Sequence, residues 1–285
     1  GLEEEAKKEI EKIKALPDTF IPKGIAAEIW GKFRDEEGSK GIIDKSAIVY
    51  SEQNILWILA LQATGYEQEA KQLVEDIKSL PDLYRNDGLL VSEIKLSYFG
   101  GVQHLTKSSF LRDGKFKKHS EERYPYINSD ANSLWALALQ ATGHEQEAKQ
   151  VVESIRSNLT YTDSEILITH QLNPSQEFRE EVNKYLKKYP HLILREKKSI
   201  NDENSFSASL LPQTNCLFAL ALRAIGYKQE AEEVLKSIIQ LPYVSNINGL
   251  IATDYGEDQY EISASNQALW VIAKSRDGYK MFTGK

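Results

Sequence analysis

Two patterns of apolar residues alternate along this chain. Leu134–Ala141 is apolar at nearly every position, and Ala148, Val151, Val152 and Ile155 then recur at helical spacing. A helix that is apolar on every face must be buried on every face, whereas an apolar stripe indicates a helix with one buried face. The pattern predicts a buried inner helix followed by an amphipathic outer helix.

An internal repeat contains this pair of helices. Asn132–Ile155, NSLWALALQATGHEQEAKQVVESI, recurs at Asn54–Ile77 with 19 of 24 positions identical and at Asn215–Ile238 with 14 of 24 identical. Each copy has a glycine between its two halves: Gly65, Gly143 and Gly226. Glycine readily takes the left-handed conformation that ends a helix, so each copy is predicted to be a helical hairpin. Ser51 and Ser129 are the expected N-caps of two inner helices.

The two ends of the chain supply half-hairpins. Leu2–Leu16 has the pattern of an outer helix and Ser265–Ser275 that of an inner helix. An open solenoid needs polar capping repeats, so two complementary halves favour a closed ring. We therefore expect an all-α protein, an (α/α) toroid of four to six hairpins and a single domain over residues 1–285. The pairing of Leu2–Leu16 with Ser265–Ser275 would close it. Thr162–Leu172 and Ser175–Tyr189 are predicted to form a divergent hairpin.

Long connections join each outer helix to the next inner helix. We expect Pro81–Asn128 to be the longest irregular connection and Arg195–Leu210 to be a polar loop, and either Pro17–Tyr50 or Gly88–Leu105 could hold a sixth hairpin. In a ring of hairpins these connections emerge at the end where the inner helices begin. That mouth would gather long loops, which are often functional, and the positive ends of several helix dipoles.

The composition of the chain excludes several classes of molecule as binding partners. The net charge of −7 argues against nucleic acid, and the apolar runs are too short to span a bilayer. The single Cys216 excludes a disulfide framework within the chain and a cysteine-rich metal site. The five histidines lack ligand spacing, so we expect no metal and no cofactor. A monomer is expected, and the sequence leaves the cellular compartment open.

Three connections place an acid after a glycine and an apolar run. The glycines are Gly24, Gly88 and Gly249, and the acids are Glu28, Glu93 and Asp254. One interpretation is an acidic ring around the mouth of the toroid. The other is a turn glycine, a buried extended segment and a carboxylate that caps the next element.

Glu52 and Asp130 occupy the same place in the first turn of two inner helices. On neighbouring helices their carboxylates would lie about 6.5–9.5 Å apart, as the acid and base of an inverting glycosidase do. Asp130 is the candidate base, and Glu52 is the candidate acid if Glu93 or Asp254 lies over it. The alternative is that both simply interact favourably with the helix dipole.

Aromatic residues are the candidates for sugar binding. Trp57, Trp135 and Trp270 occupy one repeat position, where they would either stack on a sugar or pack one hairpin against the next. Asn132 belongs to a repeated asparagine that would either bind substrate or bond to the start of its helix. Tyr126 and Tyr255 are further candidates in the connections.

The repeated hairpin, the phrase LWALALQATGHEQEAKQVVESI and a DGLL sequence resemble the six-hairpin glycosidases. The resemblance implies an (α/α) toroid whose acids at the mouth hydrolyse a glycosidic bond. The positions that match are Asp130, Glu52, Asp254, Glu93 and Glu28. We therefore expect a carbohydrate-active enzyme, a glycoside hydrolase acting on an oligo- or polysaccharide.

Three alternatives remain open. The second half of the repeat is similar to a tetratricopeptide hairpin, which would make the protein a binding scaffold for peptides or glycans. The spacing between copies departs from the 34 residues of that family. A terpenoid-cyclase toroid is a second alternative, although its aspartate-rich and Gln-Trp signatures are absent. Fourteen tyrosines keep a polysaccharide lyase with a tyrosine base as the third.

Overall fold

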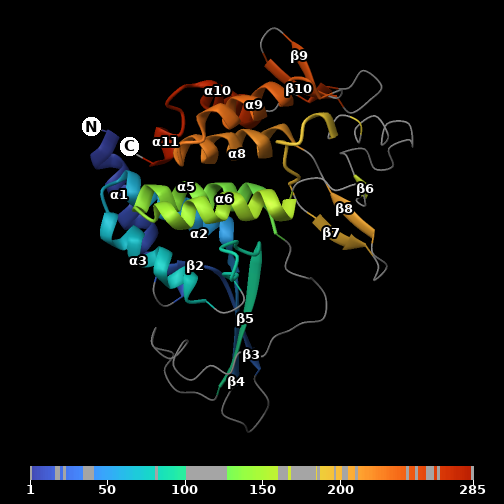
Figure 1. Cartoon of the computed structure of the whole chain (residues 1–285). Helices are drawn as coiled ribbons and strands as arrows, with labels where there is room; N and C mark the ends of the chain where they lie inside the picture. Colours follow the sequence, from blue (N-terminus) through green and yellow to red (C-terminus); the bar gives the residue numbers. More distant parts are fainter. Residues whose placement is uncertain are drawn as a thin grey trace. The chain divides into compact units, whose positions relative to one another are not determined.

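The structure is a computed structural model of the chain (Figure 1). It describes residues 2–16, 20–21, 24–34, 42–80, 83–100, 127–159, 166–167, 184, 187–195, 197–200, 205–208, 211–241, 244–247, 250–254, 260–261 and 264–283. The chain divides into two compact units, residues 1–85 with 91–125 and residues 86–90 with 126–285.

The first unit contains one complete hairpin and a three-stranded sheet. Its helices are α1 (Leu2–Lys14), α2 (Ser51–Ala63) and α3 (Glu67–Lys78). The antiparallel sheet has the order β3 (Glu28–Arg34), β4 (Ile42–Tyr50) and β5 (Glu93–Gly100). A short antiparallel pair, β1 (Phe20–Ile21) and β2 (Ile25–Ala26), precedes it.

The second unit contains two complete hairpins. They are α5 (Ser129–Thr142) with α6 (Glu145–Leu159), and α8 (Pro212–Ala224) with α9 (Lys228–Ile238). Helices α10 (Ala264–Lys274) and α11 (Lys280–Thr283) follow. One sheet joins β6 (Ile166–Leu167), β8 (Ser205–Ala208) and β7 (Lys197–Ile200), and the other joins β11 (Tyr260–Glu261), β10 (Leu250–Asp254) and β9 (Val244–Ile247).

The three predicted hairpins are confirmed, and so is the turn between their helices. Gly65, Gly143 and Gly226 have φ of 84°, 90° and 95°, the left-handed region that glycine enters without strain. After each glycine the next N–H bonds back to a carbonyl of the inner helix, as His144 N does to Leu139 O at 2.8 Å. The sequence therefore determines this turn through a single residue type.

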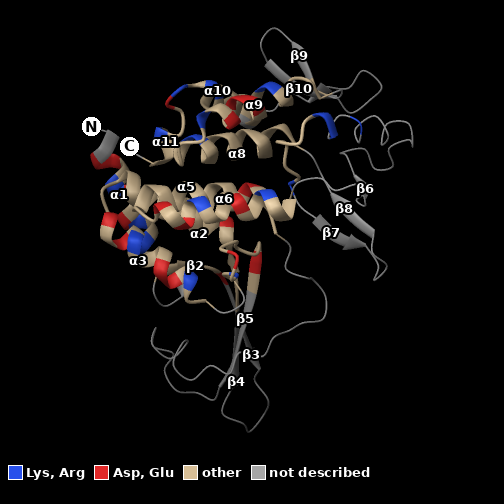
Figure 2. Ribbon diagram, viewed as in Figure 1, with Lys and Arg blue, Asp and Glu red and all other residues tan. Residues whose placement is uncertain are grey.

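The inner helices form the core, as their composition predicts. Trp135 in α5 and Phe218 in α8 have no exposed surface and are the two largest fully buried side chains among the described residues. The outer helices bury one stripe, such as Ala148, Val151 and Ile155 in α6. Figure 2 shows this contrast: α8 is almost entirely uncharged, whereas α3 carries both acidic and basic residues.

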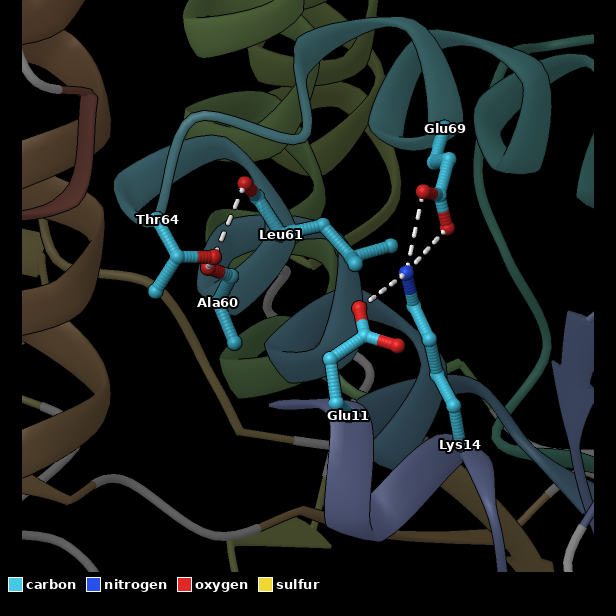
Figure 3. Close-up of polar contacts among 6 residues, drawn as sticks. All are labelled: Glu11, Lys14, Ala60, Leu61, Thr64 and Glu69. Atoms are coloured by element: carbon cyan, nitrogen blue, oxygen red, sulfur yellow. Dashed lines mark hydrogen bonds and ion pairs between the residues drawn. The ribbon is translucent and has the colours of Figure 1, made fainter. Parts of the chain in front are cut away.

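Helix α1 is joined to the first hairpin by a small polar cluster. Lys14 Nζ lies 3.2 Å from Glu11 Oε1 and 2.7 Å from Glu69 Oε2 in α3 (Figure 3). The same ammonium group lies 4.0 Å from the centre of the Tyr66 ring. Figure 3 also shows Thr64, whose hydroxyl donates to the Ala60 carbonyl at 2.7 Å and so bonds to the last turn of α2.

A repeated asparagine holds an extended segment against each inner helix. Asn132 Oδ1 accepts from Leu90 N at 2.7 Å, and its Nδ2 donates to Leu90 O at 2.9 Å and to Asn128 O at 2.9 Å. Asn54 makes the same three bonds to Ala26 and Tyr50, and Asn215 makes them to Ile193 and Leu211. The predicted contact with the helix start is confirmed, and the bonds to the segment are additional.

The serines at the helix starts have a different role from the one predicted. The N-cap residues are Tyr50 and Asn128, and Asn128 Oδ1 accepts from Asp130 N at 2.7 Å. Ser51 and Ser129 are the first helical residues, and their hydroxyls donate to the carbonyls of Val91 and Leu194. The predicted serine caps are wrong because these hydroxyls bind a neighbouring segment instead.

The structure is mainly helical rather than all-α, because the long connections contain strands. Pro17–Tyr50, one candidate stretch for a sixth hairpin, holds β3 and β4 instead. The predicted irregular connection Pro81–Asn128 holds β5, and the predicted polar loop Arg195–Leu210 holds β7 and β8. Ile166–Leu167 is a strand parallel to β8, so the predicted helix over Thr162–Leu172 is wrong there. Within Ser175–Tyr189, Lys184 and Lys187–Lys188 are helical, and most of the rest lies outside the described residues.

Closure of a toroid and a single domain over residues 1–285 stay predictions, because α1 and α10 belong to different units. The predicted apolar stripe of α1 is only partly covered: Ile10 is 4% exposed, but Ile13 is 37% and Leu16 is 53% exposed. Among the helices described, none is both long and apolar enough to cross a membrane.

Candidate active site

The sheet of the first unit gathers two of the predicted acids around a tyrosine. Glu28 on β3 pairs with Ile48 on β4, and Glu93 on β5 pairs with Tyr50 at the end of β4. Directly paired residues share a face of an antiparallel sheet, and so do residues two apart on one strand. Glu28, Tyr50 and Glu93 therefore lie on one face, with the tyrosine between the two acids.

One contact joins the tyrosine to an acid. Tyr50 Oη donates a hydrogen bond to Glu28 Oε2 at 3.4 Å. Tyr50 and Glu93 are half-buried and Glu28 is exposed, so a ligand from solvent can approach this face. Glu93 is the first residue of β5. The segment directly before it accepts hydrogen bonds from Ser51 through its carbonyls, and these bonds fix where the strand begins.

The register also gives the separation of the two acids. Glu28 and Glu93 lie on the two strands that flank β4, two residues apart along it. With strands about 4.8 Å apart and a rise of about 3.3 Å per residue, their Cα atoms are roughly 11–12 Å apart. Tyr50 bonds to Glu28 and lies directly opposite Glu93, so we expect the two carboxyl groups to lie about 6.5–9.5 Å apart, the range that an inverting glycosidase uses.

Glu52 follows Tyr50 by two residues and lies in the first turn of α2, where it is exposed. It is thus close in sequence to Tyr50, which lies between the two acids in the order of the strands. Its predicted partner Asp130 belongs to the second unit, so the Glu52–Asp130 pair stays a prediction.

Asp130 begins α5 next to an arginine. Its Oδ2 lies 3.2 Å from Arg195 Nε, and the aspartate side chain is 15% exposed. Arg195 is held there by its backbone, because Ser129 N donates to Arg195 O at 2.8 Å. A carboxylate at a helix N-terminus with an arginine beside it is an arrangement that stabilises a helix start. It also suits a base that must stay ionised.

The remaining acidic candidate lies in the second unit. Asp254 ends β10 in the second unit and pairs with Tyr260 on β11. Tyr126 and Tyr255 lie outside the described residues. The turn glycine and the buried residue after it are confirmed at Gly24 and Gly88, which have φ of 74° and 85° and precede the buried Ile25 and Leu89. The capping role of the acids that follow stays a prediction.

The repeated aromatic position is largely buried. Trp135 is fully buried and Trp270 is 5% exposed, whereas Trp57 is half-buried. Lys274 Nζ lies 5.3 Å from the centre of the Trp270 ring. Asn132 is also fully buried, and its amide makes the three bonds described above. Packing between hairpins therefore accounts for Trp135 and Asn132 better than sugar binding does.

Sequence reasoning missed Tyr50 and Arg195. Tyr50 ends a stretch, IIDKSAIVY, that is rich in β-branched residues, which is a strand signal. With that strand recognised, its last residue would have been placed beside the acids of flanking strands. Arg195 had no such signal, because only the backbone bonds of Ser129 bring it to Asp130.

No group of three or more potential metal ligands occurs within the part of the chain that the structure describes. No family model matches the sequence, and the curated proteins contain no match to it.

Proposed function

We propose that this protein is a carbohydrate-active enzyme, a glycoside hydrolase that uses Glu28 and Glu93 on either side of Tyr50. The observation that carries the proposal is their position on one face of the sheet, with Tyr50 bonded to Glu28. Hydrolysis of a glycosidic bond needs two carboxyl groups in different roles, one to protonate the leaving oxygen and one to activate water.

The roles follow from the environment of each acid. Glu28 is exposed and bonded to Tyr50, so it is the candidate base that activates water. Glu93 is half-buried at the start of its strand and is the candidate acid. Glu52 is a further carboxylate for binding sugar hydroxyls. Asp130, paired with Arg195, is the alternative base.

The acids favour a hydrolase of neutral sugars over a lyase. A lyase with Tyr50 as its base would need a uronate beside two glutamates, and like charges at such distances repel. The net charge of −7 likewise disfavours a negatively charged uronate as the substrate. The fold that we propose around this site is the (α/α) toroid, with α1 packed on α10 and the connections gathered at its mouth.

A non-catalytic binding scaffold is the second candidate. Three asparagines make equivalent bonds, and the aromatics of α5 and α8 are fully buried. The repeated positions thus serve packing, as they do in helical-repeat scaffolds. In this case the acids on the sheet would bind a ligand without cleaving it.

The test is hydrolysis of oligosaccharides that the wild-type protein retains on a glycan array, measured by the release of reducing ends. Glu28→Gln and Glu93→Gln should each lower the rate at least about 100-fold, the usual contribution of a general acid or base. Both variants should keep their affinity for the glycan and their melting temperature. Glu67→Gln, an exposed glutamate at the start of α3, is the matched control and should retain full activity.

Two results would overturn this assignment. A loss of hydrolysis in Asp130→Asn but not in Glu28→Gln would move the site to α5. A wild-type protein that retains a glycan and leaves it intact would replace the enzyme with the scaffold.

A further inference from the structure

Two buried hydroxyl groups lie near the starts of α5 and α8, both in the second unit. Ser133 on α5 and Thr214 on α8 have no exposed surface. Among the described residues, neither Ser133 Oγ nor Thr214 Oγ1 has a hydrogen-bond partner. Burying a hydroxyl without a partner costs free energy, so two such groups in one helix pair call for an explanation.

One extended segment joins the starts of these two helices. Ser129, the first residue of α5, donates from its hydroxyl to Leu194 O and from its N–H to Arg195 O at 2.8 Å. Asn215, in the first turn of α8, bonds to both backbone groups of Ile193 at 2.9 and 3.0 Å. Helix α5 also packs against α8 (Figure 1). The two helices therefore begin at the same end, beside the same segment.

The two hydroxyls are on the facing sides of this helix pair. Arg223 donates to two carbonyls at the end of α10, so its face of α8 meets α10. Thr214 lies nine residues earlier, about two and a half turns, and is thus on the opposite face, toward α5. The repeat aligns Ser133 with Cys216, which precedes Arg223 by seven residues, about two turns, and shares its face. That face of α5 meets α8, as the same face of α8 meets α10.

Other hydroxyls in the helices of this unit bond to their own helix. Thr142 in α5 donates to Ala138 O at 2.8 Å, and Ser237 in α9 donates to Glu233 O at 2.7 Å. A bond to the carbonyl four residues earlier is the usual way in which a helix satisfies a serine or threonine. Ser133 and Thr214 make no such bond, so both hydroxyls are available to a third group between the helices.

We propose that Ser133 Oγ and Thr214 Oγ1 together bind one buried water molecule between α5 and α8. Water suits this site because it both donates and accepts, and a buried water typically bonds to about two to four polar groups. A larger ligand could reach neither hydroxyl without separating the helices, since both side chains are fully buried. The water would join the two hairpins much as a direct hydrogen bond does. The proposal does not depend on the proposed hydrolysis.

A high-resolution crystal structure of the wild-type protein tests the proposal directly. We expect one ordered water within about 2.5–3.0 Å of both hydroxyl oxygens. A direct bond between the two hydroxyls would overturn the proposal, and so would a bond from each hydroxyl to a carbonyl of its own helix. A contact between α5 and α8 that contains no ordered water would overturn it as well.

A double-mutant cycle in urea tests the same site in solution. Ser133→Ala and Thr214→Val should each lower the unfolding midpoint, because each leaves the water with one partner fewer. The double variant no longer needs the water, so its loss of unfolding free energy should be smaller than the sum of the two single losses. Ser133→Ala with Thr142→Val is the control, and these losses should add, since Thr142 lies nine residues, about 13 Å, further along α5. Additive losses for Ser133 and Thr214 would contradict a shared water.

Discussion

Asn132→Ala tests whether the repeated asparagine holds the extended segment against its inner helix, because it removes three hydrogen bonds at once. The side chain bonds to both backbone groups of Leu90 and to the carbonyl of Asn128. Asn132 and Leu90 are both fully buried, so water cannot replace the lost amide without a rearrangement. The substitution leaves the N–H and the carbonyl of Leu90 without these partners, whereas the Asn128 carbonyl keeps its bond from the backbone N–H of residue 132.

The expected loss can be worked out from these groups. A buried polar group that loses its partner costs about 1–3 kcal/mol, so the two backbone groups of Leu90 give a loss of roughly 2–6 kcal/mol. In a protein of this size each kcal/mol lowers the melting temperature by about 2–4 °C. Asn132→Ala should therefore melt at least about 4 °C below the wild type.

Urea unfolding followed by circular dichroism is the assay, with a lower midpoint and an unchanged slope as the expected result. Asn86→Ala is the control, since Asn86 is exposed four residues before Leu90 and should change stability by less than about 0.5 kcal/mol. Asn54→Ala should cost less than Asn132→Ala because its partner Ala26 is only half-buried. Equal midpoints for Asn132→Ala and Asn86→Ala would refute the reasoning.

Two further predictions concern packing and pH. Trp135→Ala should cost about 3–5 kcal/mol, as expected for a buried tryptophan, and an unchanged melting temperature would contradict its place in the core. The pKa of Glu11 is lowered by the hydrogen bond from Tyr66 and then by Lys14. The stability that the Glu11 carboxylate gives to the docking of α1 should therefore be lost as pH falls through this lowered pKa. The pKa of Tyr66 is raised by its bond to Glu11 and then by burial. The stability that the Tyr66 hydroxyl gives to the docking of α1 should therefore be lost as pH rises through this raised pKa. The protection of α1 amides from hydrogen exchange, relative to the unfolded chain, should be highest between these limits. Tyr66→Phe should reduce the alkaline loss without removing it, because the pKa of Lys14 in the same cluster is also raised.

The helical hairpins could be predicted from sequence because their signals are local. A glycine at each turn, an apolar inner helix and an amphipathic outer helix need no knowledge of distant residues. Gly143 shows this most clearly, since its φ of 90° follows from its position between the two patterns. Only part of the role of Asn132 could be predicted from the sequence. Its bond to Asn128 is local, whereas its bonds to Leu90 span 42 residues.

The strands and the site could not be predicted in the same way. Whether Glu28 and Glu93 share a face depends on the register of β3, β4 and β5, which pairs residues far apart in sequence. A shift of one residue would place an acid on the other face. Tyr50 could be noticed as the end of a strand, but its contact with Glu28 comes only from that register.

The stereochemistry of hydrolysis tests the proposed site most directly. The anomeric configuration of the first product can be followed by proton NMR on an oligosaccharide that the protein cleaves. Because Glu28 and Glu93 flank Tyr50 on separate strands, the wide spacing leaves room for a water between acid and base, and the account predicts an inverted product. A product with retained configuration would require carboxyl groups only about 5–5.5 Å apart and would contradict this pair as the catalytic acid and base.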